Sequence, residues 1–209
     1  MYERILFLDF DGTITSEETL EGCMSLAIDR QLYKEKQREM IEGKITLAEA
    51  LHEGFSSIPV SRLFEMMDYV RRVPLRPGFE ELLLAMKEEG IPVVVISGGL
   101  RPCIEEKLEP YRDLILDVYS VEVDTEGDTL KLISDYEEKG DMLEKTLVMK
   151  KYDYKKAICA GDSFTDVRMA KASDMVFARD RLANILQENK IDFIPWEDFY
   201  DIKDKILGE

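Results

Sequence analysis

Three short apolar runs, separated by amphipathic segments, constrain the fold of this chain more than any other feature. The runs Ile5–Phe10, Ile91–Ser97 and Ala157–Ala160 are almost entirely hydrophobic, and each leads into an acidic, hydroxyl or glycine residue. Strands that helices cover on both faces have this composition. The segment Phe79–Glu89 follows Pro77-Gly78 and carries apolar residues at helical spacing. This alternation predicts an α/β fold, a doubly wound and mainly parallel sheet.

Two more strands and a hairpin are predicted from weaker patterns. Met175–Ala178 is a short apolar run, and Leu114–Tyr119 is a less regular one. Gly127 lies in an acidic segment between two strand-like stretches, Val118–Val123 and Thr129–Ile133, which predicts a hairpin turn there.

Residues 15–74 interrupt this rhythm, because they carry helix signals and no strand pattern. Thr15–Glu18 and Thr46–Glu49 have the spacing of capping boxes, and Ser61 can cap a later helix. We therefore predict a small helical domain inserted into the α/β core, with 15–74 as the insertion and 1–14 and 75–209 as the core.

Composition excludes several classes of protein. The chain has a formal net charge of -16 and is 45% hydrophobic, which argues against polynucleotide binding and against disorder. No apolar run approaches the roughly 20 residues of a membrane helix, and the start of the chain has no signal-peptide pattern. These features predict a cytoplasmic protein that binds neither nucleic acid nor membrane. Three widely spaced cysteines and the single His52 predict neither a disulfide framework nor a histidine metal site.

Carboxylates gather where the predicted strands end. Asp9 and Asp11 follow the first strand, and Asp162 and Asp166 follow the strand Ala157–Ala160. Open α/β sheets bind ligands at the carboxyl ends of their strands. Carboxylates this close do not all stay ionised without a cation between them, and Mg²⁺ prefers such oxygen ligands. The pattern predicts a magnesium site that leaves room for an anion.

The second long strand ends in Ser97-Gly98-Gly99, just before a predicted helix. A hydroxyl and unhindered backbone N–H groups at this point are typical of a site for phosphate oxygens. Taken one at a time, the residues allow ordinary interpretations: Ser97 as a helix cap, Asp9 and Asp11 as turn residues, and Asp166 as a charge at a helix start.

Together these segments resemble the four motifs of the haloacid dehalogenase superfamily. DFDGTIT resembles motif I, ISGG motif II and AGDSFTD motif IV, in the order and context of that superfamily. Motif III is a lysine before motif IV. Lys145 matches best, with Lys150 and Lys151 as rivals, and an ordinary solvated helix lysine is the alternative for Lys145.

The resemblance implies a phosphatase with a Rossmann-like core and Mg²⁺ as cofactor. By motif position, Asp9 would be the nucleophile that forms an aspartyl-phosphate, and Asp11 the general acid and base. The remaining roles carried over are metal binding by Asp9, Asp11 (through its backbone carbonyl) and Asp162, support of the metal or of Lys145 by Asp166, and phosphoryl binding by Ser97, Gly98, Gly99 and Lys145.

The insertion between motifs I and II resembles the cap of the phosphoserine phosphatase branch. Glu18 lies where that branch has a substrate-reading glutamate, but Gly54 aligns with its carboxylate-binding arginine. The C-terminal third, GDSFTDVRMAKASDMVFARDRL and then IPWEDFYDI, resembles the 2-hydroxy-3-keto-5-methylthiopentenyl-1-phosphate phosphatases of methionine salvage. That resemblance implies a small-molecule phosphate ester as substrate. The alternatives are phosphoserine, a range of sugar or hydroxy-acid phosphates, or a phosphate-binding protein without turnover. The sequence does not indicate an oligomeric state.

Overall fold

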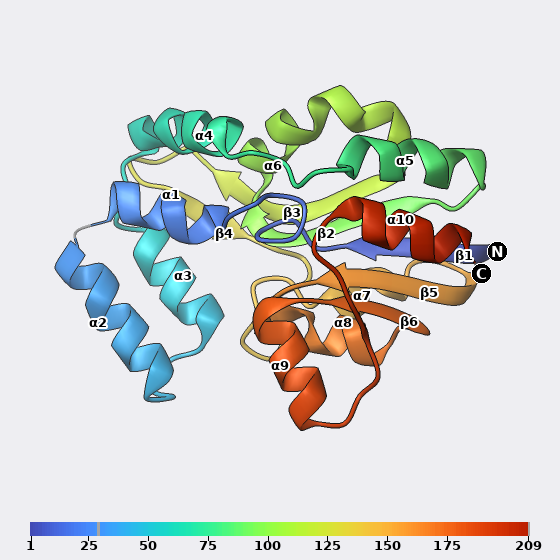
Figure 1. The fold of residues 1–209 in the computed structure, drawn as a ribbon. Coiled ribbons are helices and arrows are strands. Elements are labelled where there is room, and N and C mark those ends of the chain that lie inside the picture. The colour runs from blue at the N-terminus through green and yellow to red at the C-terminus, as the bar shows by residue number, and fades with distance from the viewer. Residues whose placement is uncertain (29, 209) are drawn as a thin grey trace.

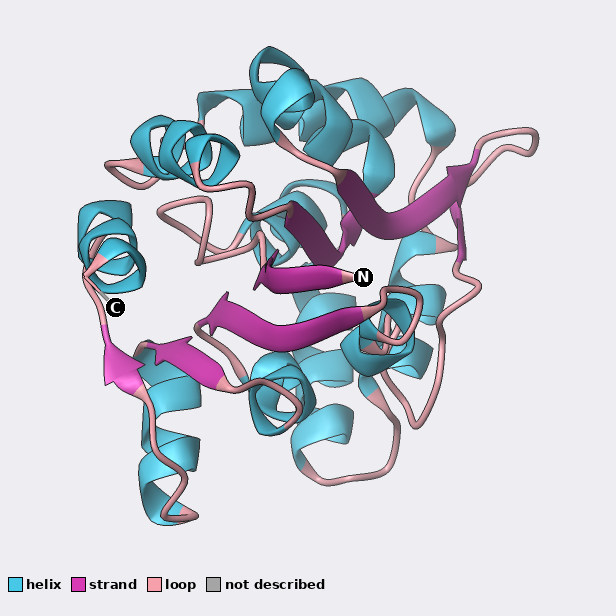
Figure 2. Ribbon diagram, turned by 90° about the vertical axis from the view of Figure 1, so that its right-hand side faces the viewer, coloured by secondary structure: helices cyan, strands magenta, loops and turns pink. Residues whose placement is uncertain are grey.

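A computed structural model describes residues 1–28 and 30–208 of the chain, and in it a seven-stranded sheet forms the centre (Figures 1 and 2). The strand order is β4-β3-β2-β1-β5-β6-β7, and every neighbouring pair is parallel except β3 and β4 at one edge. The strands are β1 (Tyr2–Leu8), β2 (Val93–Leu100), β3 (Asp117–Asp124), β4 (Lys131–Ile133), β5 (Tyr154–Gly161), β6 (Met175–Ala178) and β7 (Ile194–Pro195). The predicted doubly wound, mainly parallel sheet is confirmed.

Helices cover both faces of the sheet, as Figure 1 shows. One layer contains α5 (Phe79–Glu88), α6 (Arg101–Leu108) and α10 (Phe199–Leu207), and the other contains α7 (Lys145–Met149), α8 (Val167–Lys171) and α9 (Asp180–Glu188). Side chains of β1 alternate between two hydrophobic clusters: Leu6 and Leu8 join one, and Ile5 and Phe7 the other. All four are completely buried, which is why this strand is apolar at every position.

The strand ends differ from the sequence-based bounds by a few residues, and one strand is displaced. Leu114–Tyr119 was expected to be a strand, but the 3-10 segment η2 (Glu109–Leu114) occupies its start and β3 begins at Asp117. The predicted hairpin is confirmed by the antiparallel pairing of β3 with β4. The short edge strand β7 was not predicted, since two residues carry no periodicity.

The insertion consists of α1 (Thr19–Ala27), α2 (Arg30–Ile41), α3 (Leu47–Phe55), the 3-10 turn η1 (Val60–Arg62) and α4 (Leu63–Arg72). The capping box of Thr46 and Glu49 at the start of α3 is confirmed. The box expected at Thr15–Glu18 is wrong, because α1 begins at Thr19 and the buried Thr15 hydroxyl lies against the Phe10 and Glu17 carbonyl oxygens instead. Ser61 caps no helix, because it lies inside η1.

The insertion meets the core on two sides. Its α4 packs along α6, so that Met66 and Val70 belong to the same hydrophobic cluster as Leu6 and Leu8 of β1. The pair α2 and α3 lies beside the carboxyl ends of the strands, where α3 contacts the edge strand β4 (Figure 1). The three cysteines are buried free thiols. Within residues 1–28 and 30–208, every helix is too short or too polar to cross a membrane.

Candidate active site

The carboxylates of Asp9, Asp162 and Asp166 converge at the carboxyl end of the central strands. Each offers an oxygen atom, and these atoms lie within 4.8 Å of one another. Asp9 follows β1 and Asp162 follows β5, the parallel neighbour of β1. From β1 the chain runs outward to β2 and β3 on one side, and later to β5 and β6 on the other. The cluster therefore lies at the topological switch point, where open α/β sheets bind ligands.

Lys145 joins this cluster from the first position of α7. Its Nζ donates to Asp9 Oδ1 and to Asp166 Oδ1, each at 2.5 Å, and the residue is only 2% exposed. The rival lysines lie elsewhere: Lys150 is exposed, and the Lys151 ammonium stacks over Tyr119 on another surface. Of the three lysines that the sequence left open, the structure brings Lys145 to the carboxylates. It is not the solvated helix lysine of the alternative interpretation.

Asp166 ties the motif IV loop together as well as holding Lys145. Its Oδ2 accepts the backbone N–H groups of Asp162 and Ser163, both at 3.0 Å. Asp166 is completely buried, and the backbone of Gly161 passes so close that a Cβ there would lie 2.6 Å from the carboxylate. The carboxylate therefore fixes the loop that carries Asp162, in addition to the helix-start role considered from sequence.

Asp11 lies on the side of the cluster that faces the insertion. Its Oδ1 accepts the Thr19 backbone N–H at 3.1 Å and also the Thr19 hydroxyl, while Oδ2 accepts the Ser97 hydroxyl at 3.1 Å. The Asp11 carboxylate is thus not brought into the metal-type cluster, and of this residue only the backbone carbonyl is left for that role. Ser97 does not cap the following helix, which begins at Arg101.

Two glycines make room for these carboxylates. Gly12 has a φ of 74°, and a Cβ there would lie 2.5 Å from Asp162 Oδ2. A Cβ at Gly99 would lie 2.9 Å from Asp11 Oδ2. Any larger residue would displace an acidic side chain, so the glycines of DFDGT and SGG serve the geometry of the site. Gly98 lines the pocket above them.

When all of its carboxylates are ionised, the cluster has an excess of negative charge that needs a further cation. Three carboxylates and one ammonium leave two negative charges in a site where no member is more than 6% exposed. Burial raises the pKa of Asp9 to about 7 and that of Asp162 to about 9, with neighbouring carboxylates adding to both shifts. Burial alone lowers the pKa of Lys145, but Asp166 and Asp9 raise it overall, so this side chain is a cation. A buried excess of two negative charges, borne by oxygen ligands, fits a divalent metal ion.

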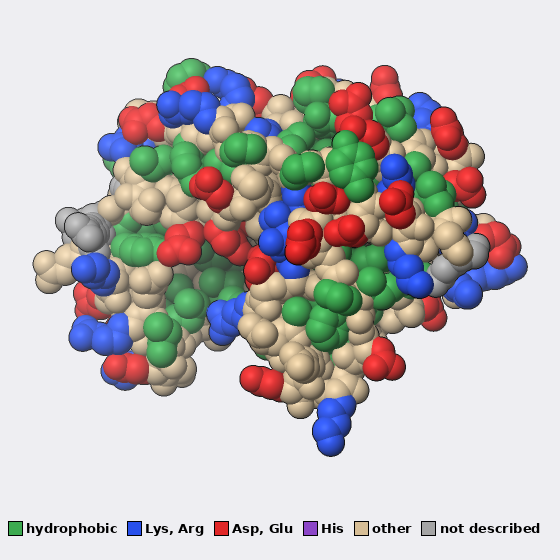
Figure 3. All heavy atoms as spheres, viewed as in Figure 1, with side chains coloured by type: hydrophobic (Ala, Val, Ile, Leu, Met, Phe, Trp, Pro, Cys, Tyr) green, Lys and Arg blue, Asp and Glu red, His purple; other side chains and the backbone are tan. Residues whose placement is uncertain are grey.

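A pocket of about 510 Å³ opens above the cluster, between the core and the insertion. Figure 3 shows it as a hollow with acidic side chains at its upper edge and hydrophobic side chains within it. Asp9, Asp11, Gly98, Lys145 and Asp162 line its floor. Its walls are mostly apolar and include Leu20, Met24, Leu47 and Leu51 of the insertion and Met142 and Leu143 of the core.

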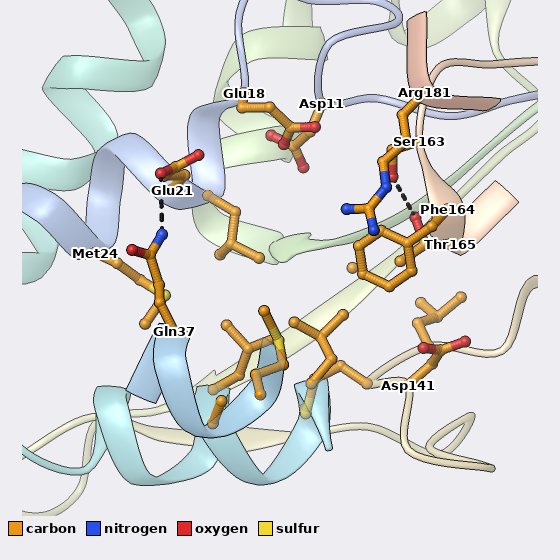
Figure 4. A pocket seen from close by; sticks show the side chains of 18 of the residues that line it. Asp11, Glu18, Glu21, Met24, Gln37, Asp141, Ser163, Phe164, Thr165 and Arg181 are labelled. Carbon is orange, nitrogen blue, oxygen red and sulfur yellow. Dashed lines mark hydrogen bonds between the residues drawn. The ribbon is translucent and has the colours of Figure 1, made fainter. Parts of the chain in front are cut away.

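Glu18 reaches this pocket next to Asp11, as Figure 4 shows. Partial removal from water, together with the charges of Asp11 and Asp9, raises the pKa of Glu18 to about 8. A glutamate at this place can accept hydrogen bonds from a bound molecule, and its protonated form can also donate one. Its predicted role in substrate recognition stays a prediction.

Sequence reasoning missed several residues that hold the site. Thr13 donates to Asp162 Oδ1 at 3.0 Å, and Thr19 holds Asp11 as described above. Arg168 forms ion pairs with Asp141 and Glu144, which flank the pocket and precede Lys145. The threonine of the DGT segment was a signal for the first of these contacts. No local pattern in the sequence marks the contacts of Thr19 and Arg168.

Comparison with known proteins agrees with this geometry. Residues 6–171 match the family model described as haloacid dehalogenase-like hydrolase. The chain is 36% identical to a 2-hydroxy-3-keto-5-methylthiopentenyl-1-phosphate phosphatase from Microcystis aeruginosa, over 98% of both chains. It is 29% identical to a phosphatase of the same name from Geobacillus kaustophilus, over 98% of this chain and 96% of the relative. A phosphoserine phosphatase solved as a phospho-aspartyl intermediate analogue has the same fold, with a TM-score of 0.69, 21% identity and coverage of 97% and 98%.

Proposed function

The chain belongs to the haloacid dehalogenase-like hydrolase family, and from this premise we propose that it hydrolyses 2-hydroxy-3-keto-5-methylthiopentenyl-1-phosphate with Mg²⁺ as cofactor. One observation carries the chemistry: Asp9, Asp162 and Asp166 present oxygen atoms within 4.8 Å of one another, and the Lys145 ammonium donates to Asp9 and Asp166. This arrangement supports phosphoryl transfer, which depends on positioning and on neutralising charge.

In the proposed reaction Asp9 is the nucleophile. A carboxylate oxygen of Asp9 bonds to phosphorus as the bond from phosphorus to the ester oxygen breaks, and the departing oxygen takes a proton from Asp11. In the second half, Asp11 takes a proton from water, whose oxygen attacks phosphorus and releases phosphate from Asp9. Removal from water raises the pKa of Asp11, which favours the protonated form that the first half requires.

The residues around Asp9 take the other roles. Asp9, Asp162 and the Asp11 carbonyl would hold Mg²⁺, which supplies positive charge to the phosphoryl oxygens. Ser97, the backbone of Gly98 and Gly99, and Lys145 would bind those oxygens from the other side. Asp166 keeps Lys145 charged and in place, because it accepts a hydrogen bond from the same ammonium.

The wall of the pocket supports the choice of substrate. Phosphoserine would bring a carboxylate in addition to its phosphate, and that carboxylate needs a cation in the insertion. Gly54 is buried, and a Cβ there would lie 2.9 Å from Met24 Cε and 3.0 Å from Ile28 Cδ1, so methyl groups fill this place. An apolar wall suits the methylthio end that the relatives' substrate name describes. We also propose residues 15–74 as a cap domain that selects the leaving group.

A substrate panel with purified protein tests this proposal. We expect Mg²⁺-dependent phosphate release, with kcat/KM for the methylthiopentenyl phosphate at least about 100-fold above that for phosphoserine, since one buried carboxylate without a partner costs that much or more. A higher value for phosphoserine or for sugar phosphates would replace the proposed substrate. Binding of phosphate esters without turnover of any of them would overturn the proposed reaction itself.

A further inference from the structure

We propose that Arg181 is a specificity residue that binds two adjacent oxygen atoms of the leaving group. These oxygens are on the second and third carbons, counted from the carbon that bears the phosphate. This inference rests on the proposed function and deepens it. The pocket needs a group of this kind, because acidic side chains line its floor and hydrocarbon lines most of its wall. Carboxylates and hydrocarbon cannot donate hydrogen bonds to hydroxyl and carbonyl oxygens, whereas a guanidinium presents five N–H donors in a planar fork.

Arg181 differs from the other cations that line the pocket. Lys145 is engaged by Asp9 and Asp166, and Lys36 by Glu39 and Glu53. Arg181 makes no ion pair with any acidic residue that the structure describes; its guanidinium carbon lies 4.6 Å from the ring centroid of Phe164. Figure 4 shows its side chain running past Ser163 to that ring, with the guanidinium facing the open middle of the pocket. Its donors thus face the space where a leaving group would lie.

The backbone around Arg181 is fixed to the catalytic floor. The preceding residue, Asp180, has a φ of 46°, a conformation that few residues other than glycine adopt and that clusters at functional sites. The following residue, Leu182, is completely buried, and its N–H donates to the Asp162 carbonyl oxygen at 2.7 Å. The backbone of Arg181 is therefore held at a defined position relative to Asp162, although the side chain itself is exposed.

The stacking partner comes from the same floor. Phe164 belongs to the 3-10 segment η3 (Phe164–Asp166), two residues after Asp162, and it is 37% exposed, which is unusual for so large a hydrophobic side chain. Its ring lies against the guanidinium, and a guanidinium bound in this way can still donate hydrogen bonds from its N–H groups. The relatives' substrate name specifies a 2-hydroxy and a 3-keto group, an adjacent pair of oxygens that such an edge can bind together.

The test compares two phosphate esters with the same number of carbons, dihydroxyacetone phosphate and n-propyl phosphate. Arg181→Met is expected to lower kcat/KM for the oxygenated ester about 10- to 100-fold, mainly through KM, and to change the value for the propyl ester less than about twofold. Arg181→Lys keeps the charge but loses the planar set of N–H donors. Its log kcat/KM for dihydroxyacetone phosphate should therefore lie closer to that of Arg181→Met than to that of the wild type. Lys205→Met on the exposed surface of α10 removes one positive charge elsewhere and serves as control.

Two outcomes would overturn the role of Arg181: equal losses for both esters, or full activity of Arg181→Met on dihydroxyacetone phosphate. Failure of the proposed function is distinguishable, since the wild-type protein would then hydrolyse neither ester with Mg²⁺. In that case the Kd of dihydroxyacetone phosphate, measured by calorimetry in Asp9→Asn with and without Arg181→Met, decides the question. A weakening of about tenfold or more supports the assignment, and an unchanged Kd rejects it.

Discussion

The floor and the wall of the pocket are built on opposite principles. On the floor, charged side chains from separate strand ends are buried or half-buried and are fixed by hydrogen bonds, as Lys145 is by Asp9 and Asp166. On the wall, side chains such as Met24 and Leu51 make apolar contacts that constrain size and little else. The difference indicates that the reaction depends on residue identity at a few positions, whereas the choice of substrate depends on a surface that tolerates exchange.

The largest expected effect comes from the floor. Asp9→Asn keeps the shape of the side chain but removes its charge and its nucleophilicity, so we expect kcat to fall about 10⁴-fold or more. Phosphate release from the preferred substrate measures it. The thermal melt should still show a cooperative transition, because the neutral amide removes one of the crowded charges. Wild-type rates in the Asp9→Asn variant would contradict the division between floor and wall.

Lys145→Met is the second-largest change, and it acts on stability as well as rate. The substitution leaves Asp9 and Asp166 buried without their shared cation, and removing one partner of a buried pair costs about 3–5 kcal/mol. Urea unfolding without added metal measures this loss. Lys150→Met, an exposed lysine five residues later, should stay within about 0.5 kcal/mol of the wild type. Equal effects of the two substitutions would place the motif III lysine elsewhere.

The floor was predictable from the sequence because its features are local and costly. Asp9, Asp11 and Asp162 lie at the ends of apolar runs. A charge at the end of a buried strand costs free energy unless a partner compensates it, so these residues indicate a site. The parallel sheet then followed from the α/β pattern, and parallel strands bring their carboxyl ends to one edge of the sheet, although the order of the strands was not predicted. Lys145 could not be separated from Lys150 and Lys151, since a lysine on a short helix carries no local mark of what it contacts.

The wall was much less predictable, for a physical reason. Its residues come from segments far apart in the chain: Leu20 and Met24 lie in α1, Leu51 in α3, and Met142 and Leu143 in the core. Helical periodicity shows that a segment is amphipathic, but it does not show which neighbour receives the apolar face. The error at Thr15 has a local origin, because the spacing of a capping box was present while the Thr15 hydroxyl bonds to the nearby carbonyl oxygens of Phe10 and Glu17.

The effects of Mg²⁺ and of pH on the stability of the protein should be linked through the carboxylates of the floor. In the metal-free protein the pKa of Asp9 is raised to about 7 and that of Asp162 to about 9, above the ordinary value near 3.8, so the folded state binds protons that the unfolded chain has lost. This contribution to stability is complete below pH about 4 and is lost as the pH rises through 7 and then 9. Mg²⁺ should compensate for the lost protons.

We therefore expect Mg²⁺ to raise the Tm more at a pH of about 8.5 than at a pH of about 6. At a concentration about 100 times the Kd the stabilisation is about 2.7 kcal/mol. Calorimetric scans with Mg²⁺ and with a chelator measure it. Asp162→Asn should remove most of the rise in Tm that Mg²⁺ causes. A rise in Tm that is equal at both pH values would show that the cation does not replace protons at these carboxylates.

The smallest expected effect tests the wall. Met24 lines the pocket from α1 and is 7% exposed, and glutamine has nearly the same volume but places an amide against hydrocarbon. Met24→Gln should lower kcat/KM about tenfold for the methylthiopentenyl phosphate and leave dihydroxyacetone phosphate within about twofold, because only the former has an apolar end that reaches the wall. A loss shared equally by both esters would mean that Met24 supports the floor. In that event the two regions would not divide reaction from selection at this position.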